Sequence, residues 1–163
     1  MTRMPPLEID HLSQLKEFEG REAPPTDWFV VTQDRIRKFA DAIEDRQWIH
    51  VDTERAARES PYGGTVAHGF LTLSLFSHLF AQSIHIRDGI SMRINYGLNR
   101  VRFPSVVPAG SAIRARVTIL SVKESTEFVE ATYAVTIECR NADKPCCVAE
   151  CLARYYRSWF GVG

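Results

Sequence analysis

The feature that most limits how this chain can fold is a segment that is apolar on almost every side. From Phe70 to Phe80 the sequence reads FLTLSLFSHLF, without an Asp, Glu, Lys or Arg. A helix of that composition has no polar face to turn towards water, so other elements have to enclose it. In a chain of 163 residues, the usual length of one domain, the simplest enclosure is a curved sheet wrapped around the helix.

The second half of the chain supplies strands for such a sheet. Alternation of apolar and polar residues is typical of strands, and it is clearest in residues 113–119 and 129–135. Turn-forming residues separate four predicted strands, which are Ser91–Phe103, Ala112–Lys123, Phe128–Arg140 and Pro145–Tyr156. One early strand, a helical segment and then an antiparallel meander predict the fold class α+β.

The first part of the chain is predicted to be mostly helical. Apolar residues at helical spacing over Leu7–Phe18 indicate an N-terminal helical extension, residues 1–25, of a single domain that spans residues 1–163. The other predicted elements are a strand over Trp28–Val31, a helix capped by Thr32 and ending at Ile43, and a short helix capped by Thr53 and ending at Ala57.

Charge and hydropathy exclude several classes of partner. The chain has 20 Lys and Arg residues against 20 Asp and Glu residues, so its formal net charge is zero, which argues against binding to nucleic acid or to an anionic membrane. No apolar run reaches the length of a membrane span, and residues 1–6 lack the apolar core of a secretory signal. We therefore expect a cytoplasmic protein.

All four cysteines lie in the last quarter of the chain, in apolar runs that are predicted to be strands. They are Cys139, Cys146, Cys147 and Cys151, and no Cys-x-x-Cys pair occurs among them. Buried, reduced thiols are the favoured interpretation, and use in metal binding or redox chemistry is the alternative.

Residues able to do chemistry gather just before the apolar helix. Asp45 and His50 follow a predicted helix end, where a turn of the chain can bring both to one pocket. A carboxylate and an imidazole at that range can hold one water molecule and move its protons. Next come a Gly-rich turn, Pro61–Gly64, and then His68-Gly69 at the helix start. A helix start offers free N–H groups that can hold an oxygen becoming negative in a transition state.

Each of these residues also has a simpler interpretation. An Asp and a His near a helix end often serve as a cap and a surface side chain, and a histidine before a glycine, such as His68, is often structural. Asp45, His50 and His68 are also candidates for a zinc site, but the HExxH spacing of a zinc-binding helix is absent. There is no Walker loop, nucleophile elbow or dinucleotide fingerprint either, so no metal and no other cofactor is predicted.

The order of these motifs resembles that of a known family. Asp45 is followed by Gln47-Trp48-Ile49-His50, and His68-Gly69 comes later, at the start of the apolar helix. The MaoC-like dehydratases, which are R-specific enoyl-CoA hydratases of hot-dog fold, have an Asp, then Asn-Pro-Leu-His, and then a His-Gly that opens the central helix. This chain has Gln47 and Trp48 where that pattern has Asn and Pro.

Two later motifs narrow the resemblance to one branch of this family. Asn95–Asn99 (NYGLN) and Arg102–Pro104 (RFP) are similar to the nodulation-protein-N-like branch, which includes mycobacterial R-hydratases. The likeness covers roughly Trp28–Tyr156, and it implies an antiparallel sheet wrapped around a central helix.

The resemblance also implies an activity and a site. The activity is an R-specific hydro-lyase of fatty-acid metabolism, which adds water reversibly to trans-2-enoyl thioesters. Asp45 and His50 match the catalytic pair, and Gly69 matches the glycine whose backbone N–H faces the thioester carbonyl. Which of Asp45 and His50 is the base, the acyl chain length, and the choice between CoA and acyl-carrier protein stay open.

Two other functions are considered beside this one. A hot-dog thioesterase usually carries its carboxylate on the central helix, but Phe70–Phe80 contains none. A non-catalytic acyl-binding subunit would tolerate the loss of Asp45 or His50, and both are present. Four basic residues are candidates for contacts with CoA phosphates or for solvated strand faces: Arg93, Arg100, Arg102 and Lys123.

A homodimer is the predicted assembly. A sheet of about five strands around one helix leaves an edge strand and apolar surface uncovered. We expect the sheets of two copies to join or abut, with the acyl channel near their interface.

Overall fold

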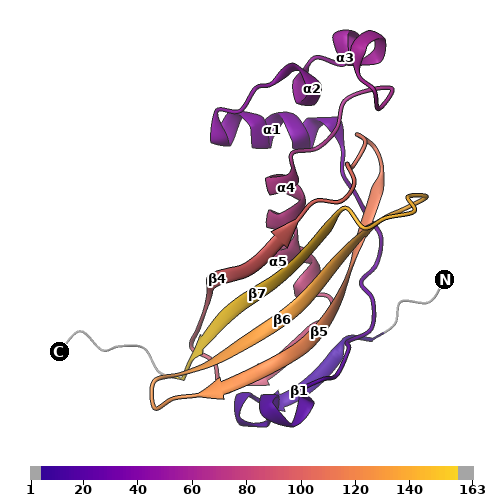
Figure 1. Ribbon diagram of the computed structural model, residues 1–163. Helices are drawn as coiled ribbons and strands as arrows, with labels where there is room; N and C mark the ends of the chain where they lie inside the picture. Colours follow the sequence, from indigo (N-terminus) through magenta and orange to yellow (C-terminus); the bar gives the residue numbers. More distant parts are fainter. Residues whose placement is uncertain (1–4, 158–163) are drawn as a thin grey trace.

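The computed structural model describes residues 5–157, which form a long sheet curled around a short helical segment (Figure 1). The sheet has the strand order β2-β5-β6-β7-β4, and every pair of neighbours is antiparallel. Its strands are β2 (Phe29–Val30), β4 (Met92–Arg102), β5 (Ala112–Glu124), β6 (Phe128–Cys139) and β7 (Cys147–Tyr156). The predicted α+β class and the four long strands are confirmed.

The connectivity of the sheet differs from a simple meander. Strands β5, β6 and β7 follow one another, but β4, which precedes them in the chain, pairs with β7 at the far edge. The connection from β4 to β5 therefore crosses the end of the sheet, and β4 and β2 are its two edge strands.

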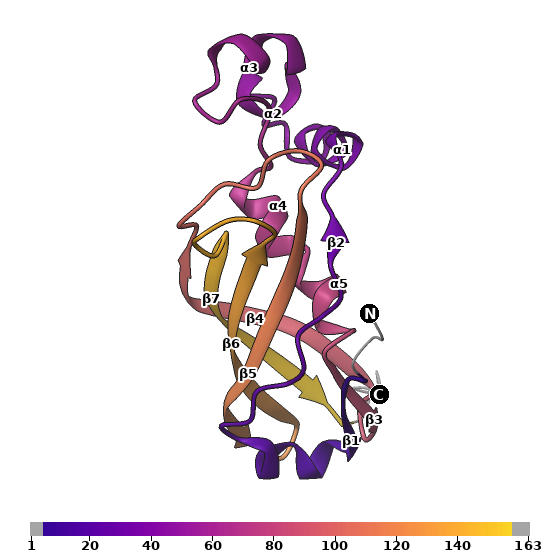
Figure 2. The ribbon, with the colours of Figure 1, turned by 90° about the vertical axis from the view of Figure 1, so that its right-hand side faces the viewer.

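The apolar segment forms two short helices that run along the curled sheet, α4 (Gly69–Ser74) and α5 (Phe76–Phe80), as Figure 2 shows. The Leu75 N–H donates to the Leu71 carbonyl and the Leu79 N–H to the Leu75 carbonyl, both at 3.0 Å, so the helical path continues across the boundary. The rings of Phe80 and Tyr133 on β6 lie 4.9 Å apart. The predicted central helix is therefore present and packs on the sheet.

The enclosure of this helix is incomplete at its first turn. Phe70 is 67% exposed, and its ring meets that of Phe103 edge-on. By contrast, Leu79 and Phe80 at the other end are buried. The first turn of the helix, which follows His68 and Gly69, is therefore less enclosed than its last turn.

The predicted N-terminal helix is wrong over its first part. Residues Leu7–His11 form strand β1, which pairs in parallel with β3 (Ile84–Asp88), a strand that was not predicted. Only Leu12–Phe18 is helical, as a 3-10 helix. Buried Leu7 and Ile9 alternate with exposed Glu8 and Asp10, so the same apolar residues also fit a strand, and pairing with β3 decides between the two.

The remaining helices gather at one end of the sheet (Figure 1). They are α1 (Gln33–Ile43), α2 (Trp48–Val51) and α3 (Thr53–Glu59). Thr32 caps α1 as predicted, because its hydroxyl accepts from the Arg35 N–H at 3.2 Å. The predicted cap of α3 is wrong: Asp52, not Thr53, accepts from the Arg55 N–H, at 2.9 Å, and α3 continues beyond Ala57. No helix within residues 5–157 has the length and apolar character needed to cross a membrane.

The four cysteines are buried and free, as predicted. Burial raises the pKa of Cys146 to about 12 and the pKa values of Cys147 and Cys151 to about 11. These thiols are protonated at neutral pH, so they are poor nucleophiles and poor metal ligands.

Candidate active site

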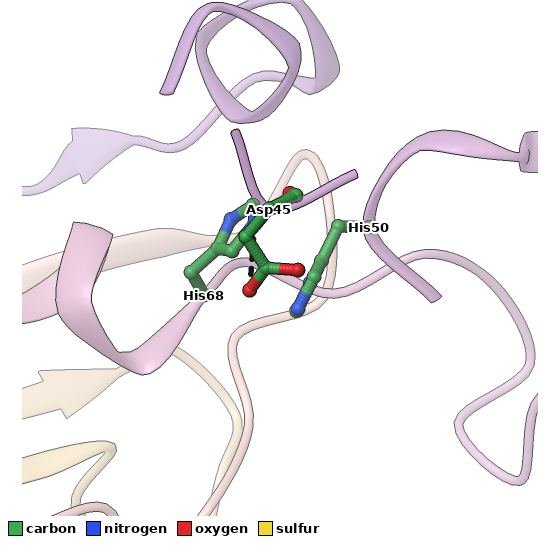
Figure 3. A group of neighbouring side chains, drawn as sticks. All are labelled: Asp45, His50 and His68. Atoms are coloured by element: carbon green, nitrogen blue, oxygen red, sulfur yellow. Dashed lines mark hydrogen bonds and ion pairs between the residues drawn. The ribbon is translucent and has the colours of Figure 1, made fainter. Parts of the chain in front are cut away.

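Asp45, His50 and His68 come together beside the start of α4 (Figure 3). Each residue contributes one polar side-chain atom, a ring nitrogen or a carboxylate oxygen, and these three atoms lie within 4.8 Å of one another. They reach this point from the turn after α1, from α2 and from the residue before α4. The turn forms because Glu44 takes a left-handed conformation, with φ of 61°, which ends α1 and redirects the chain at Asp45.

Hydrogen bonds to the main chain fix the orientation of His50. Its Nδ1–H donates to the Val66 carbonyl at 2.7 Å, which leaves Nε2 with a free lone pair. The Gln33 side-chain amide donates to the His50 carbonyl at 2.8 Å, and the Thr65 hydroxyl donates to Gln33 in turn. His50 is only 7% exposed and sits in α2, so the imidazole is held by its surroundings rather than carried on a free loop.

His68 connects the other two residues of the site. Its Nε2–H donates to the main-chain carbonyl of Asp45 at 2.9 Å, and its ring stacks on that of His50 with centroids 3.6 Å apart. The edge of its ring also faces Phe39, at 5.3 Å. His68 is buried, and its Nδ1 has no hydrogen-bond partner within residues 5–157. His68 therefore positions both the turn that carries Asp45 and the ring of His50.

Asp45 supplies the solvent-facing side of the site. Its side chain is 51% exposed, and its Oδ2 lies 3.8 Å from His68 Nε2. Its Oδ1 accepts from the Gln47 N–H at 3.3 Å. The carboxylate is thus held near both imidazoles but stays open to water and to a ligand.

Burial keeps His50 in its neutral form. Burial lowers its pKa from the ordinary value of 6.5, and the neighbouring His68 lowers it further. The bond to the Val66 carbonyl and the charge of Asp45 act in the opposite direction but do not cancel the effect. At neutral pH, His50 Nε2 can therefore accept a proton.

The geometry of the two imidazoles does not suit a shared metal ion. The rings of His50 and His68 are nearly parallel, with 24° between their planes. Nitrogen lone pairs lie in the ring planes, so stacked rings direct them side by side, whereas tetrahedral zinc needs them to converge. The group is better arranged to bind a water molecule or a polar substrate atom.

Gly69, the first residue of α4, lies next to this group in the chain. As the first residue of the helix its N–H has no intrahelical acceptor, and no other acceptor within residues 5–157 bonds to it. A Cβ atom added there would lie 2.9 Å from the ring of Phe103, which is too close for an ordinary contact. The position therefore requires glycine, and its N–H is available to a ligand.

A cavity of about 230 Å³ lies further along the helix, between α4–α5 and the strands β4 and β7. Leu73 on α4 and Leu98 on β4 belong to its wall. Asp45 and His50 are not part of its lining, but Leu73 is one helical turn beyond Gly69. On the helix, the wall of the cavity thus begins one turn beyond Gly69.

Known proteins resemble this chain in both sequence and structure. The profile of the MaoC like domain matches residues 16–139. The 3-hydroxyacyl-thioester dehydratase Z of Mycobacterium tuberculosis is 44% identical over 148 residues, which cover 90% of this chain and 97% of that protein. Nodulation protein N of Rhizobium leguminosarum bv. viciae is 46% identical over 132 residues, covering 80% and 81%.

Among solved structures, the unliganded form of an R-hydratase from Pseudomonas aeruginosa has a TM-score of 0.65 to this chain. The two are 21% identical, and the match covers 86% of this chain and 83% of that one. At this level of identity the likeness is one of fold, and it agrees with the sheet wrapped around α4 and α5.

Proposed function

The chain belongs to the MaoC-like domain family, and we propose that it is a hydro-lyase that adds water reversibly to trans-2-enoyl thioesters. The family and the hydro-lyase class predicted from the sequence motifs are confirmed by the relative named as a 3-hydroxyacyl-thioester dehydratase. One structural observation supports the chemistry: His50 and the carboxylate of Asp45 gather around His68, and the next residue, Gly69, has an N–H that no acceptor within residues 5–157 bonds. Fatty-acid metabolism in the cytoplasm is the setting we propose.

The proposed mechanism divides the work between these three groups. Asp45 and His50 hold a water molecule, and one of them takes its proton as the water oxygen bonds to the β-carbon. The electron pair of the double bond moves towards the thioester, whose oxygen becomes negative and accepts from the Gly69 N–H. The α-carbon then takes a proton from the pair. Both the carboxylate and the neutral imidazole can take this proton, so the proton acceptor is assigned to the pair and not to one residue.

The reaction class is tested with crotonyl-CoA. We expect loss of the enoyl absorbance with no matching release of free CoA thiol, because water held by Asp45 and His50 approaches beyond the carbonyl, at the β-carbon. In heavy water, the 3-hydroxyacyl product should carry deuterium at its α-carbon, and chiral chromatography should show the R product.

The alternatives give different results in the same assay. Stoichiometric release of thiol with the double bond untouched would assign a thioesterase, although residues 70–80 carry no carboxylate. Saturable binding of crotonyl-CoA without either reaction would assign a non-catalytic acyl-binding subunit.

The exposed edge strand β4 supports the proposed homodimer. Strand β4 has 11 residues and pairs only with β7 in the described part of the chain. Its apolar side chains Ile94, Tyr96 and Leu98 are between 39% and 52% exposed. A long edge of this kind is normally covered, and a second copy of the same edge is the simplest cover.

We expect light scattering at micromolar concentration to give twice the chain mass of 18.5 kDa. Ile94→Lys should weaken the dimer, because it places a charge on the β4 edge. Val30→Lys, at an exposed apolar position on the opposite edge strand β2 (51%, against 39% for Ile94), is the matched control and should leave the dimer intact. A wild-type mass equal to one chain would contradict the prediction.

A further inference from the structure

The helices α4 and α5 run antiparallel to β4, and three contacts fix their alignment. Gly69 approaches Phe103 just after β4 ends. In the middle, the Asn95 side-chain amide donates to the Ser77 hydroxyl at 3.3 Å. At the other end, the Arg93 guanidinium lies 4.0 Å from the centre of the Phe80 ring. Ser77 is eight residues beyond Gly69, which is about 12 Å along a helix axis. The space between helix and strand therefore leads from the proposed oxyanion site towards Arg93.

The cavity in this space changes character along its length. Near the Gly69 end its wall is apolar, with Leu73 and Leu98. Arg93 and Tyr133 also line it, and both contact Phe80, at the far end of the helix. The end of the cavity beside Phe80, called the deep end below, thus carries a cation and a hydroxyl, and Ser77 and Asn95 add polar side chains to the wall.

Arg93 and the pair Tyr133 and Tyr155 have hydrogen-bond donors that the described residues leave unused. The Nε–H of Arg93 is buried and has no acceptor within residues 5–157, and no carboxylate in that range forms an ion pair with Arg93. The hydroxyls of Tyr133 and Tyr155 lie 2.6 Å apart, so one donates to the other and the second keeps a hydrogen that this bond does not use. The Arg93 guanidinium also lies 5.8 Å from the centre of the Tyr155 ring. Buried donors without acceptors are costly, and a ligand can supply the missing acceptor.

We propose that the deep end of this cavity binds a carboxylate at the distal end of the acyl chain, so that the preferred substrates are ω-carboxyacyl thioesters of medium length. A carboxylate is planar and matches the guanidinium of Arg93, while a tyrosine hydroxyl donates a further bond. A simple alkyl chain would place its methyl group against a cation and leave the donors unpaired. The inference rests on the proposed function for the direction in which the acyl chain runs.

Arg93 also has a structural contact that the test has to separate from ligand binding. Its guanidinium lies over the ring of Phe80, and such a cation–π contact stabilises the fold by itself. A purely structural Arg93 would affect all substrates equally. A carboxylate-binding Arg93 affects only those that carry the distal carboxylate.

The experiment compares kcat/KM for octenoyl-CoA with that for its ω-carboxy analogue, octenedioyl-CoA. The wild-type enzyme should prefer the analogue by about 10–100-fold, the scale of a buried bond to a charged group. Arg93→Met keeps most of the side-chain volume and should abolish this preference, because it lowers kcat/KM for octenedioyl-CoA more than kcat/KM for octenoyl-CoA. Arg37→Met, at an exposed position on α1, is the control and should retain the preference. Equal kcat/KM values for the two substrates in the wild type, or an equal loss on both in Arg93→Met, would overturn the proposal.

A binding measurement makes the result independent of turnover. The saturated thioesters adipyl-, suberyl- and sebacyl-CoA are each titrated into the protein in a calorimeter, and so are their monocarboxylic counterparts. At least one of the three dicarboxylic thioesters should bind about 10-fold more tightly than its counterpart. Tyr133→Phe, which removes only a hydroxyl, should reduce that advantage about 2–10-fold even if Arg93→Met fails to fold. If none of the three binds more tightly than its counterpart, the proposal is wrong. An Arg93-dependent advantage without hydration of any enoyl-CoA would uphold the carboxylate site and refute the proposed hydro-lyase.

Discussion

Asp45→Asn is expected to lower kcat for hydration of crotonyl-CoA by about 10²–10⁴ and to leave KM nearly unchanged. The amide has the shape of the carboxylate and can still accept from the Gln47 N–H, a contact of 3.3 Å in the wild type. It cannot take a proton from water. Because Asp45 is half exposed, the substitution should not disturb the fold, so the loss reports on the chemistry.

The same loss in kcat is expected for His50→Ala and His50→Gln. His50→Ala also leaves the Val66 carbonyl without its donor, since the imidazole is buried and bonded to it at 2.7 Å. Some loss of thermal stability should accompany this variant. His50→Gln retains a side-chain N–H that can donate in its place, and it therefore separates stability from catalysis.

A matched carboxylate variant provides the control for this series. Asp34→Asn alters an exposed acid on α1 that pairs with Lys38 at 2.8 Å, away from the site, and should keep full activity. Unfolding temperature and elution volume are measured for every variant. Near-full turnover by Asp45→Asn would show that this carboxylate does not activate the water.

The sequence allowed the long strands and the central helix to be predicted because their signals are local. Alternation along β5 and β6 and the apolar run before them need no information about partners. The pairing of β1 with β3 and the position of β4 beside β7 depend on contacts between distant segments. In residues 7–18 the local pattern fits both a helix and a strand, so the outcome depends on whether a distant segment, here β3, is available for pairing.

The site shows the same division between local and distant information. The predicted helix end before Asp45 indicated that a turn can bring Asp45 and His50 to one pocket, and in the structure they lie in one group. His68 was a candidate only as a structural residue or a zinc ligand. Its stacking on His50 and its bond to the Asp45 carbonyl arise because the residue before α4 meets the turn after α1. Arg93 was likewise one of four candidate cations, and only the structure distinguishes it by its buried Nε.

Gly69→Ala is expected to lower kcat by about 10²–10³, the scale for loss of one donor to a developing oxyanion. The substitution keeps the N–H itself, and alanine is a better helix former than glycine. However, the new methyl group would lie 2.9 Å from the ring of Phe103, so the backbone or the ring has to move. A displaced N–H no longer meets the thioester oxygen at hydrogen-bond distance.

Gly64→Ala is the matched control for this prediction. A Cβ atom added at Gly64 meets nothing within 4 Å, and its backbone does not need a positive φ, so activity should be retained.

The double variant Gly69→Ala with Phe103→Leu removes the clash and should recover part of the lost kcat if displacement of the N–H is the cause. No recovery, with an intact fold, would instead attribute the loss to the methyl group occupying substrate space. Wild-type kcat for Gly69→Ala alone would show that the thioester oxygen is held elsewhere.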